Sequence, residues 1–352
     1  MARSVLNNVG FRGLSVVVAS RKVDNLVVSE SEKQARERLV RNIGIRYRRI
    51  NKPGQTFCDL AKIACDDLLA NIGWKPETVD ALIMVTQSSE YIIPSTAIIM
   101  QDQLGLPTSC IAFDINLGCS GYPYGIFVVG RMLAATGIRR ALVVIGDQSA
   151  SDGAQDAGRE ILFSDAATAT ALEYSADAPP MFFEGFSDGS GHKAIYVPHG
   201  GKRNPVSEGS FKPRMWDDGV IRSSIDVHLN GPAILNFSIA RAPEALHSML
   251  GFSGFKADEV DGFYLHQANR MINETIRKKM KVEAERMPES LHDFGNTSSA
   301  SIPVTLAYRH ADYLRTPGKK LVMCGFGIGL SWASLAMVTP AGSYCSGIIE
   351  DV

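Results

Sequence analysis

Apolar residues recur along the chain with two periods, which predict helices alternating with buried strands. Residues 56–72 carry apolar positions three and four apart, as on one face of an amphipathic helix. Residues 79–85 form a nearly continuous apolar run, which is typical of a strand covered on both faces of its sheet. The same patterns predict further strands at 11–19, 111–117 and 141–147, and further helices at 30–42 and from Pro94 onward.

The second half of the chain repeats this order. A helical pattern at 237–250 precedes an apolar strand at 260–266, and a helix led by small residues at 296–314 precedes another strand at 319–325. The spacing also matches, since Asp80 lies 61 positions before Ala141 in the first half and the corresponding interval in the second half is 60. Matched order and spacing indicate a duplicated α/β unit with sheets packed between helices.

The repeat suggests how the chain is divided. We expect residues 1–175 to form one half and residues 218–352 the other. Residues 176–217 are rich in glycine and proline, which favours loops and short strands that cover a tunnel.

A cysteine stands where a predicted strand turns into a predicted helix. The sequence Gly118-Cys119-Ser120-Gly121 follows the strand at 111–117. The helix dipole and free N–H groups favour a thiolate at that position, and small neighbours let a substrate carbonyl approach. The alternative is a buried structural cysteine. Asp261 lies 181 positions after Asp80, and the same offset from Cys119 leads to Ala300. Ala300 is therefore the counterpart of Cys119 in the second half, and the helices that follow these two residues are expected to pair at the centre.

Composition narrows the class of protein. The 352 residues are 45% hydrophobic and 21% charged with a net charge of −1, which fits a globular protein with no general attraction to nucleic acid. The six cysteines include no C-x-x-C pair and are expected to be reduced thiols in the cytoplasm. The apolar run at 14–19 is too short to cross a membrane, so it is interpreted as part of the first strand.

Three further stretches follow predicted strands or open a predicted helix, where α/β sheets place their sites. They are His266-Gln267-Ala268-Asn269, Asp293 to Ser298, and Gly325-Phe326-Gly327-Ile328-Gly329. Taken singly, the histidine fits a structural role and the Gly-Asn pair an ordinary turn. The glycine run is also compatible with binding a dinucleotide phosphate, but residues 330–338 after it read as a strand and not as the helix that this motif requires.

As a set, these motifs resemble the β-ketoacyl-acyl-carrier-protein synthase III family of the thiolase superfamily. The resemblance extends over nearly the whole chain, and the other matching stretches are Gly44-Ile45-Arg46, Pro94-Ser95, Phe113 to Cys119 and Phe163-Ser164-Asp165-Ala166. It implies a duplicated five-layer αβαβα sandwich and a homodimer. It also implies substrates carried on phosphopantetheine, as acyl-CoA or acyl-ACP and malonyl-ACP.

The chemistry of these residues agrees with the resemblance. A thiolate at Cys119 accepts an acyl group from a thioester at little cost, with backbone N–H groups of Cys119 and Ile328 as the oxyanion hole. His266 and Asn296 are suited to stabilise the enolate left when malonyl-ACP loses carbon dioxide, and His266 also to help form the thiolate. Carbon attack on the acyl-Cys119 thioester then gives a β-ketoacyl-ACP. No metal or nicotinamide cofactor is needed.

Some positions depart from the family. Ile328 stands where the family has the middle of three successive glycines. Well-studied members have a tryptophan before Gly-Ile-Arg that stacks on the adenine of coenzyme A, whereas residues 37–39 are Glu-Arg-Leu. Coenzyme A and a carrier protein therefore both remain open as acyl donors. Arg159 is a candidate for the family's nucleotide-contacting arginine.

Further expectations concern the acyl pocket and the carrier protein. Phe163 is expected to line the acyl pocket, and Ile93 to extend into that of a partner subunit. A basic stretch after the histidine motif is expected either to be a solvated helix face or to dock an acidic acyl carrier protein and its phosphopantetheine phosphate. Its residues are Arg270, Arg277, Lys278 and Lys279.

Three functions remain open at this point. The first is decarboxylative condensation in fatty-acid or specialised lipid or polyketide biosynthesis. The second keeps the acyl-Cys119 step but passes the acyl group to an alcohol or amine. The third is a non-catalytic partner subunit of a heterodimeric synthase. The presence of His266 and Asn296 beside Cys119 favours condensation, because plain acyl transfer needs no decarboxylation pair.

Overall fold

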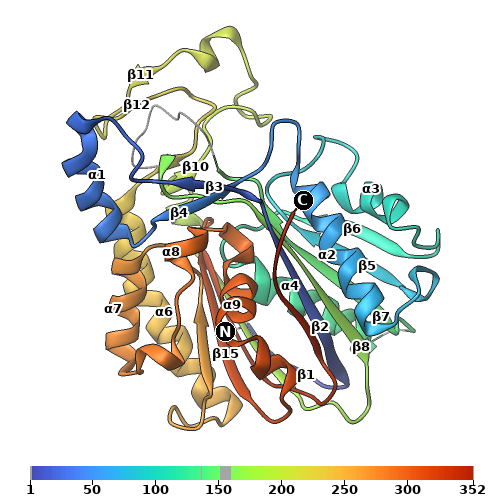
Figure 1. Cartoon of the computed structure of the whole chain (residues 1–352). Coiled ribbons are helices and arrows are strands. Elements are labelled where there is room, and N and C mark those ends of the chain that lie inside the picture. Colours follow the sequence, from blue (N-terminus) through green and yellow to red (C-terminus); the bar gives the residue numbers. More distant parts are fainter. Residues whose placement is uncertain (1, 136, 151–159, 352) are drawn as a thin grey trace.

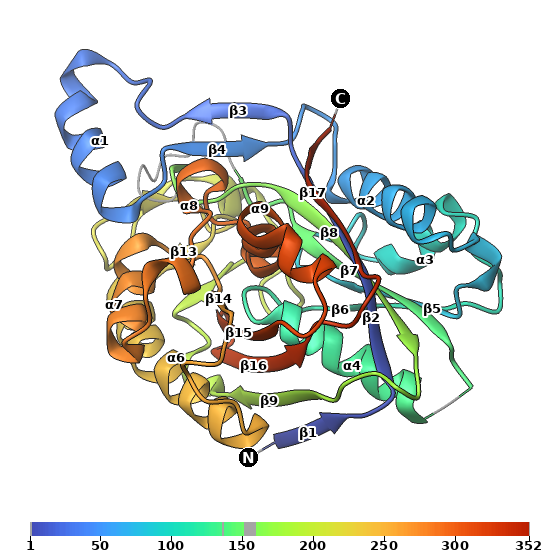
Figure 2. The ribbon, with the colours of Figure 1, turned by 60° about the horizontal axis from the view of Figure 1, so that its bottom comes forward.

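The computed structural model describes residues 2–135, 137–150 and 160–351. Two mixed sheets form the body of the molecule, with helices between them and on both outer faces (Figure 1, Figure 2). The strands are β1 (Ala2–Leu6), β2 (Val9–Val18), β3 (Arg21–Asp24), β4 (Tyr47–Ile50), β5 (Ala81–Val85), β6 (Ile111–Ile115), β7 (Arg140–Asp147), β8 (Ala166–Tyr174), β9 (Met181–Ser187), β10 (Ile195–Tyr196), β11 (Arg214–Met215), β12 (Ile221–Arg222), β13 (His228–Leu229), β14 (Gly262–Leu265), β15 (Lys320–Gly327), β16 (Ser331–Val338) and β17 (Tyr344–Glu350). The helices are α1 (Glu30–Ile43), α2 (Phe57–Ile72), α3 (Thr96–Gln103), α4 (Gly121–Ala135), α6 (Gly231–Ser253), α7 (Arg270–Met280), α8 (Leu291–Phe294) and α9 (Ser301–Arg315), the last preceded by a 3₁₀ turn, η5 (Ser298–Ala300).

The two sheets share one topology, which confirms the duplication. The first has the order β17-β2-β8-β7-β5-β6 and the second the order β1-β9-β16-β15-β14. In the first, β5 pairs parallel to β7, and the β7–β8 and β8–β2 pairs are antiparallel. In the second, β14 pairs parallel to β15, and the β15–β16 and β16–β9 pairs are antiparallel. The four strands β2, β8, β7 and β5 therefore correspond to β9, β16, β15 and β14, whereas the edges differ: β6 has no counterpart in the second sheet, and β17 runs parallel to β2 while β1 runs antiparallel to β9.

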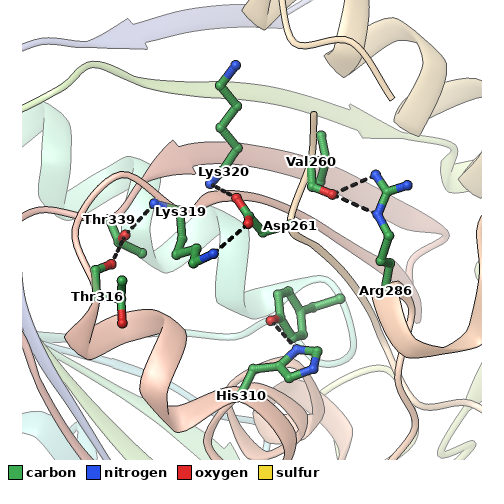
Figure 3. Close-up of polar contacts among 9 residues, drawn as sticks. Val260, Asp261, Arg286, His310, Thr316, Lys319, Lys320 and Thr339 are labelled. Carbon is green, nitrogen blue, oxygen red and sulfur yellow. Dashed lines mark hydrogen bonds and ion pairs between the residues drawn. The ribbon is translucent and has the colours of Figure 1, made fainter. Parts of the chain in front are cut away.

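An aspartate marks the same place in each half. Asp80 accepts a hydrogen bond from the backbone N–H of Arg140 at 3.0 Å, and Asp261 accepts one from that of Lys320 at 2.8 Å (Figure 3). In both halves the aspartate N–H also donates to the carbonyl of the same partner at 2.9 Å. Each aspartate thus fixes the start of the parallel strand pair, which explains why the two intervals in the sequence are nearly equal.

The termini cross between the halves. Strand β1 pairs with β9 in the second sheet, and β17 pairs with β2 in the first. Strand β9 itself lies in the stretch 176–217 that the sequence analysis assigned to loops and short strands, and it is a full member of the second sheet. The predicted boundaries at 175 and 218 therefore do not separate the two sheets, because β1 and β9 belong to the second sheet and β17 belongs to the first.

Helices complete five layers, so the predicted αβαβα sandwich is confirmed. Helices α4 and α9 lie between the sheets, where Val129, Ile126 and Leu306 join the core that both sheets share. Helices α2 and α3 cover the outer face of the first sheet, and α6 and α7 that of the second (Figure 1). Within the described ranges, no helix has the length and apolar character needed to cross a lipid bilayer.

Glycine allows close packing beside the site. A methyl group on Gly146, the next-to-last residue of β7, would overlap with the carbonyl oxygen of Ala166 and lie 2.7 Å from the ring of Phe57. We expect Gly146→Ala to lower the free energy of unfolding by about 1–3 kcal/mol, as overpacking does. The matched change Gly251→Ala, on an exposed position of α6 with no atom within 4 Å, should be neutral or stabilising by at most about 1 kcal/mol. Denaturant midpoints measure both, and equal effects would contradict the packing described here.

Candidate active site

A cavity of about 770 Å³ opens where the two halves meet. The first half contributes residues that follow β5, β6 and β7, and the second contributes residues that follow β14 and β15. Cys119, His266 and Asn296 all line this cavity. The structure therefore brings together the three residues that the sequence analysis singled out.

Cys119 sits in the turn between β6 and α4. The N–H of Gly121 donates to the carbonyl of Gly118 at 2.7 Å and starts the helix, and only 6% of Cys119 is exposed. Strand β15 passes directly against it: a methyl group on Gly327 would lie 2.6 Å from the cysteine Cβ and 2.8 Å from its sulfur. Gly327 has φ of +157°, so glycine is required here both for its conformation and for the space left to the sulfur.

The Cys119 thiol is neutral at rest. Burial raises the pKa of Cys119 to about 11, and the negative charge of Asp147 adds to the increase. Hydrogen bonds from the backbone N–H groups of Ile328 and Cys119 and from the side chain of Ser298 act in the opposite direction. These are the two backbone N–H groups that the sequence analysis assigned to the oxyanion hole, and that role stays a prediction.

His266 follows β14 and is 2% exposed. Its Nδ1 lies 2.8 Å from the Ser301 hydroxyl, which also accepts from the backbone N–H of Gln267 at 3.2 Å. Burial lowers the pKa of His266 to about 4, opposed by a hydrogen bond with the main chain of Ser298. The imidazole is therefore uncharged at neutral pH.

Asn296 is held by the other half of the molecule. Its backbone N–H donates to the carbonyl of Leu162 at 3.0 Å, and its carbonyl accepts from the N–H of Ser164 at 2.9 Å. Its side-chain Oδ1 accepts from the N–H of Ser298 at 2.9 Å. Because the oxygen is occupied, the amide NH₂ is the end of the side chain that remains for a ligand.

Ser298 links the three candidate catalytic residues. Its N–H donates to Oδ1 of Asn296 at 2.9 Å, and its side chain and main chain lie close enough to Cys119 and His266, respectively, to act on the pKa values of both. Its φ is +50°, in the left-handed region that a non-glycine residue seldom adopts. The contacts on both sides of Ser298 hold this conformation in place.

The sequence analysis did not identify Asp147, a buried acid at the end of β7. Its carboxylate accepts from the N–H of Gln87 at 2.6 Å, from Thr86 Oγ1 at 3.1 Å and from Ser299 Oγ at 3.0 Å. Burial raises its pKa, and these hydrogen bonds oppose the shift. In the sequence, Asp147 could have been recognised as a candidate by its position at the end of a predicted buried strand, where α/β sheets place functional groups.

The predicted acyl-pocket residues lie in different places. Phe163 lines the cavity, whereas Ile93 is 84% exposed, stands beside Ile92 at 93%, and does not line it. The expectation that Ile93 enters a partner's pocket stays a prediction. Arg159 lies outside the described residues.

The basic stretch lies on α7 and does not line the cavity. Arg277 pairs with Glu274 at 2.8 Å, Lys279 donates to the carbonyl of Ile239 at 2.7 Å, and Arg270 is 3.5 Å from Glu289. Lys278 is exposed. The last three basic residues stand about 10 Å beyond Arg270 along the helix, away from the cavity-lining Asn269 and Met271. Docking of a carrier protein on this stretch stays a prediction.

Among the described residues, no group of three or more histidine, cysteine, aspartate or glutamate side chains is arranged to hold a metal ion. The six cysteines are free thiols.

Two halves of one topology enclose a cavity at their junction, with a cysteine at the start of the central helix of the first half and a histidine at a strand end of the second. This arrangement defines the class of thiolase-fold enzymes.

Comparison with known proteins identifies the family within this class. The family described as 3-oxoacyl-[acyl-carrier-protein (ACP)] synthase III matches residues 113–189, and its C-terminal part matches residues 250–339. Two proteins named beta-ketoacyl-[acyl-carrier-protein] synthase III are similar: that of Symbiobacterium thermophilum is 31% identical and covers 94% of this chain and 97% of its own, and that of Gloeobacter violaceus is 30% identical and covers 92% and 96%. The crystal structure of a 3-oxoacyl-(acyl-carrier protein) synthase from Burkholderia xenovorans LB400 is 33% identical, with a TM-score of 0.92 and 99% of both chains covered. The chain belongs to the β-ketoacyl-acyl-carrier-protein synthase III family of condensing enzymes.

The pKa of Cys119 predicts how its reactivity depends on pH. With a pKa of about 11, the thiolate fraction and the rate of alkylation by iodoacetamide should rise about tenfold for each pH unit between 7 and 9. Asp147→Asn removes a negative charge that raises this pKa, so the variant should react several-fold faster at pH 8. Peptide mass spectrometry reads the modification at Cys119, with the exposed Asp177→Asn as the control. A rate that levels off by pH 8 in the wild type would contradict the assignment.

Proposed function

We propose that this protein transfers an acyl primer to Cys119 and condenses it with malonyl-ACP by decarboxylation. The observation that carries the proposal is that Cys119, His266 and Asn296 line one cavity around Ser298, whose N–H donates to Asn296. A nucleophile and two neutral hydrogen-bond donors are the groups that the two half-reactions require.

In the first half-reaction, Cys119 takes the acyl group. His266, in the tautomer whose Nδ1–H donates to the Ser301 hydroxyl, accepts the thiol proton on Nε2, and the sulfur attacks the carbonyl of the incoming thioester. The backbone N–H groups of Cys119 and Ile328 stabilise the oxygen anion of the tetrahedral intermediate. The new carbon–sulfur bond at Cys119 replaces the one to the donor, and the donor thiolate leaves with the proton.

In the second half-reaction, malonyl-ACP loses carbon dioxide and forms an enolate. For this step His266 takes the other tautomer: the Ser301 hydroxyl, which accepts from Gln267, donates its own proton to Nδ1, and the imidazole proton lies on Nε2. That N–H and the amide NH₂ of Asn296 bind the enolate oxygen. The enolate carbon attacks the acyl-Cys119 carbonyl, the carbon–sulfur bond breaks, and the Cys119 thiolate takes up a proton from solvent.

The carrier protein is part of the proposal. The names of the similar proteins refer to an acyl carrier protein, and Arg270, with 43% of its side chain exposed, adjoins the cavity-lining Asn269 and Met271. A guanidinium there is suited to the phosphate of phosphopantetheine. The primer arrives as an acyl-CoA or an acyl-ACP thioester, and Lys278 extends the basic surface for an acidic carrier.

A second copy of the chain is the proposed partner. Strand β6 is at the edge of the first sheet, and its Ile111 and Phe113 are 46% and 36% exposed. Ile98 of α3 and the loop residues Ile92 and Ile93 add further exposed apolar surface. An open strand edge beside exposed apolar side chains is suited to pairing with another chain. Pairing there is proposed to carry Ile93 into the partner's cavity.

Two variants test the separate roles of Cys119 in acyl transfer and of Asn296 in decarboxylation. Cys119→Ala should lose the acyl adduct that the wild type forms with acyl thioesters. Asn296→Ala should still form the adduct, but its release of carbon dioxide from malonyl-ACP should fall at least about 100-fold, because one enolate donor is missing. Intact-protein mass spectrometry and carbon dioxide assay give the two readouts, and Asn71→Ala, on exposed α2 surface, is the control. Condensation is excluded if acyl transfer to an alcohol or amine proceeds without carbon dioxide release, and an absent adduct points to a non-catalytic partner subunit.

The dimer is tested by charges placed on the apolar face. The double variant Ile93→Asp/Phe113→Asp should sediment as a monomer, whereas the wild type should sediment at twice the chain mass of 38.1 kDa. Val27→Asp is a matched control, because Val27 is 81% exposed in the connection between β3 and α1. A wild-type monomer, or an unchanged dimer in the double variant, would show that this face is not the interface.

A further inference from the structure

We propose that the acyl group carried on Cys119 is a short, oxygenated one, with a hydroxyl or keto oxygen at its third carbon that Gln87, Asn116 and Gln148 bind. This inference rests on the proposed acyl-Cys119 intermediate and names its substrate class.

The cavity has two contrasting sides. Away from the catalytic residues, the side formed by residues 195–272 is mainly apolar: Ile195, Val197, Val227, Leu229, Ile234 and Leu235 line it together with the polar Tyr196, Asn236 and Asn269. The side from the first half is mainly polar: Gln87, Ser88, Asn116, Asp147, Gln148 and Ser149 line it together with Cys119, Ala150, Leu162 and Phe163. The apolar side extends to the exposed Met271 and Val197, so we assign it to the arm of the incoming thioester. The acyl group bound to sulfur then faces the polar side.

The polar groups reach the backbone that carries the nucleophile. Gln87 Oε1 lies 2.5 Å from the position of a Cβ on Gly118, the residue immediately before Cys119. The Nε2 of Gln87 donates to Oδ1 of Asn116 at 3.1 Å, so the two carboxamides form one pair. This pair is therefore within reach of the first three or four carbons of an acyl chain on the sulfur.

Each carboxamide keeps one group for a ligand. The pair leaves Gln87 Oε1 as an acceptor and Asn116 Nδ2 as a donor. Gln148 donates through Nε2 to the carbonyl of Gln55 at 3.2 Å, which leaves its Oε1. In the described part of the chain, none of these three remaining groups has a hydrogen-bond partner. A hydrocarbon chain placed here would displace their water without replacing its hydrogen bonds, whereas an oxygenated chain replaces them.

The three carboxamides are exposed to solvent in the single chain, as are the nearby apolar side chains of Ile111 and Phe113 on β6. Among these exposed side chains, the carboxamides line the cavity and the two apolar ones do not. A wall of carboxamides is poorly suited to a saturated chain. A hydroxyl donates to the free carboxamide oxygens, and a keto oxygen accepts from Asn116 Nδ2.

The test compares acyl groups of equal length as thioesters of pantetheine, which needs neither coenzyme A nor a carrier protein. Wild-type protein is mixed with the pantetheine thioesters of butyrate, 3-hydroxybutyrate and acetoacetate, and the rate of adduct formation at Cys119 is followed by intact-protein mass spectrometry. At least one oxygenated acyl group should load at least tenfold faster than butyryl. Gln87→Leu should reduce that preference at least tenfold, and Gln103→Leu, an exposed position at the end of α3, should not change it.

The outcomes separate this inference from the proposed function. Equal loading of all three acyl groups, or preference for butyryl, overturns the inference and leaves the acyl-Cys119 step intact. No loading from any thioester overturns the proposed function. If Gln87→Leu does not fold, the wild-type comparison and Asn116→Leu decide, because Asn116 carries the other half of the pair.

Discussion

The site depends on one serine held in an unfavourable backbone conformation. Ser298, at φ +50°, connects to Cys119, His266 and Asn296, and its hydroxyl also reaches the carboxylate of Asp147. These contacts come from both halves of the molecule, so the junction of the two sheets and the arrangement of the reactive groups are stabilised together. A change in the packing between α4, η5 and β15 would therefore alter the chemistry even without touching a reactive group.

Burial determines the protonation states of Cys119 and His266 in the resting site. It raises the pKa of Cys119 to about 11 and lowers that of His266 to about 4, so both groups are neutral at pH 7. A neutral imidazole can accept the thiol proton in one step and donate a hydrogen bond in the next. The cost is stability in acid: below about pH 6.5 the unfolded chain takes up the histidine proton first, so the folded state loses stability down to about pH 4.

The sequence predicted the fold because the strongest signals are local. Apolar runs and helical spacing located most core strands and helices, and the spacing from Asp80 and Asp261 to the next strand identified the duplication. Strand β8 was not predicted, since its alanines and threonines form no strongly apolar run. The exchange of the terminal strands was also not predicted, because pairing partners far apart in the sequence leave no local pattern.

The same limit applies to the site. The three motifs with Cys119, His266 and Asn296 were visible in the sequence, and the structure brings them to one cavity. Asp147 and the carboxamides of Gln87 and Gln148 were not, because their role depends on which side chains meet across strand ends.

The central claim is that the acyl group on Cys119 is consumed by a carbon nucleophile. The most direct test is a single turnover in which isolated acyl-Cys119 protein is mixed with malonyl-ACP and both proteins are weighed by mass spectrometry. The account predicts that the acyl mass leaves Cys119 only with malonyl-ACP present, with an equal amount of β-ketoacyl-ACP and carbon dioxide; loss of the acyl group without that product would contradict it.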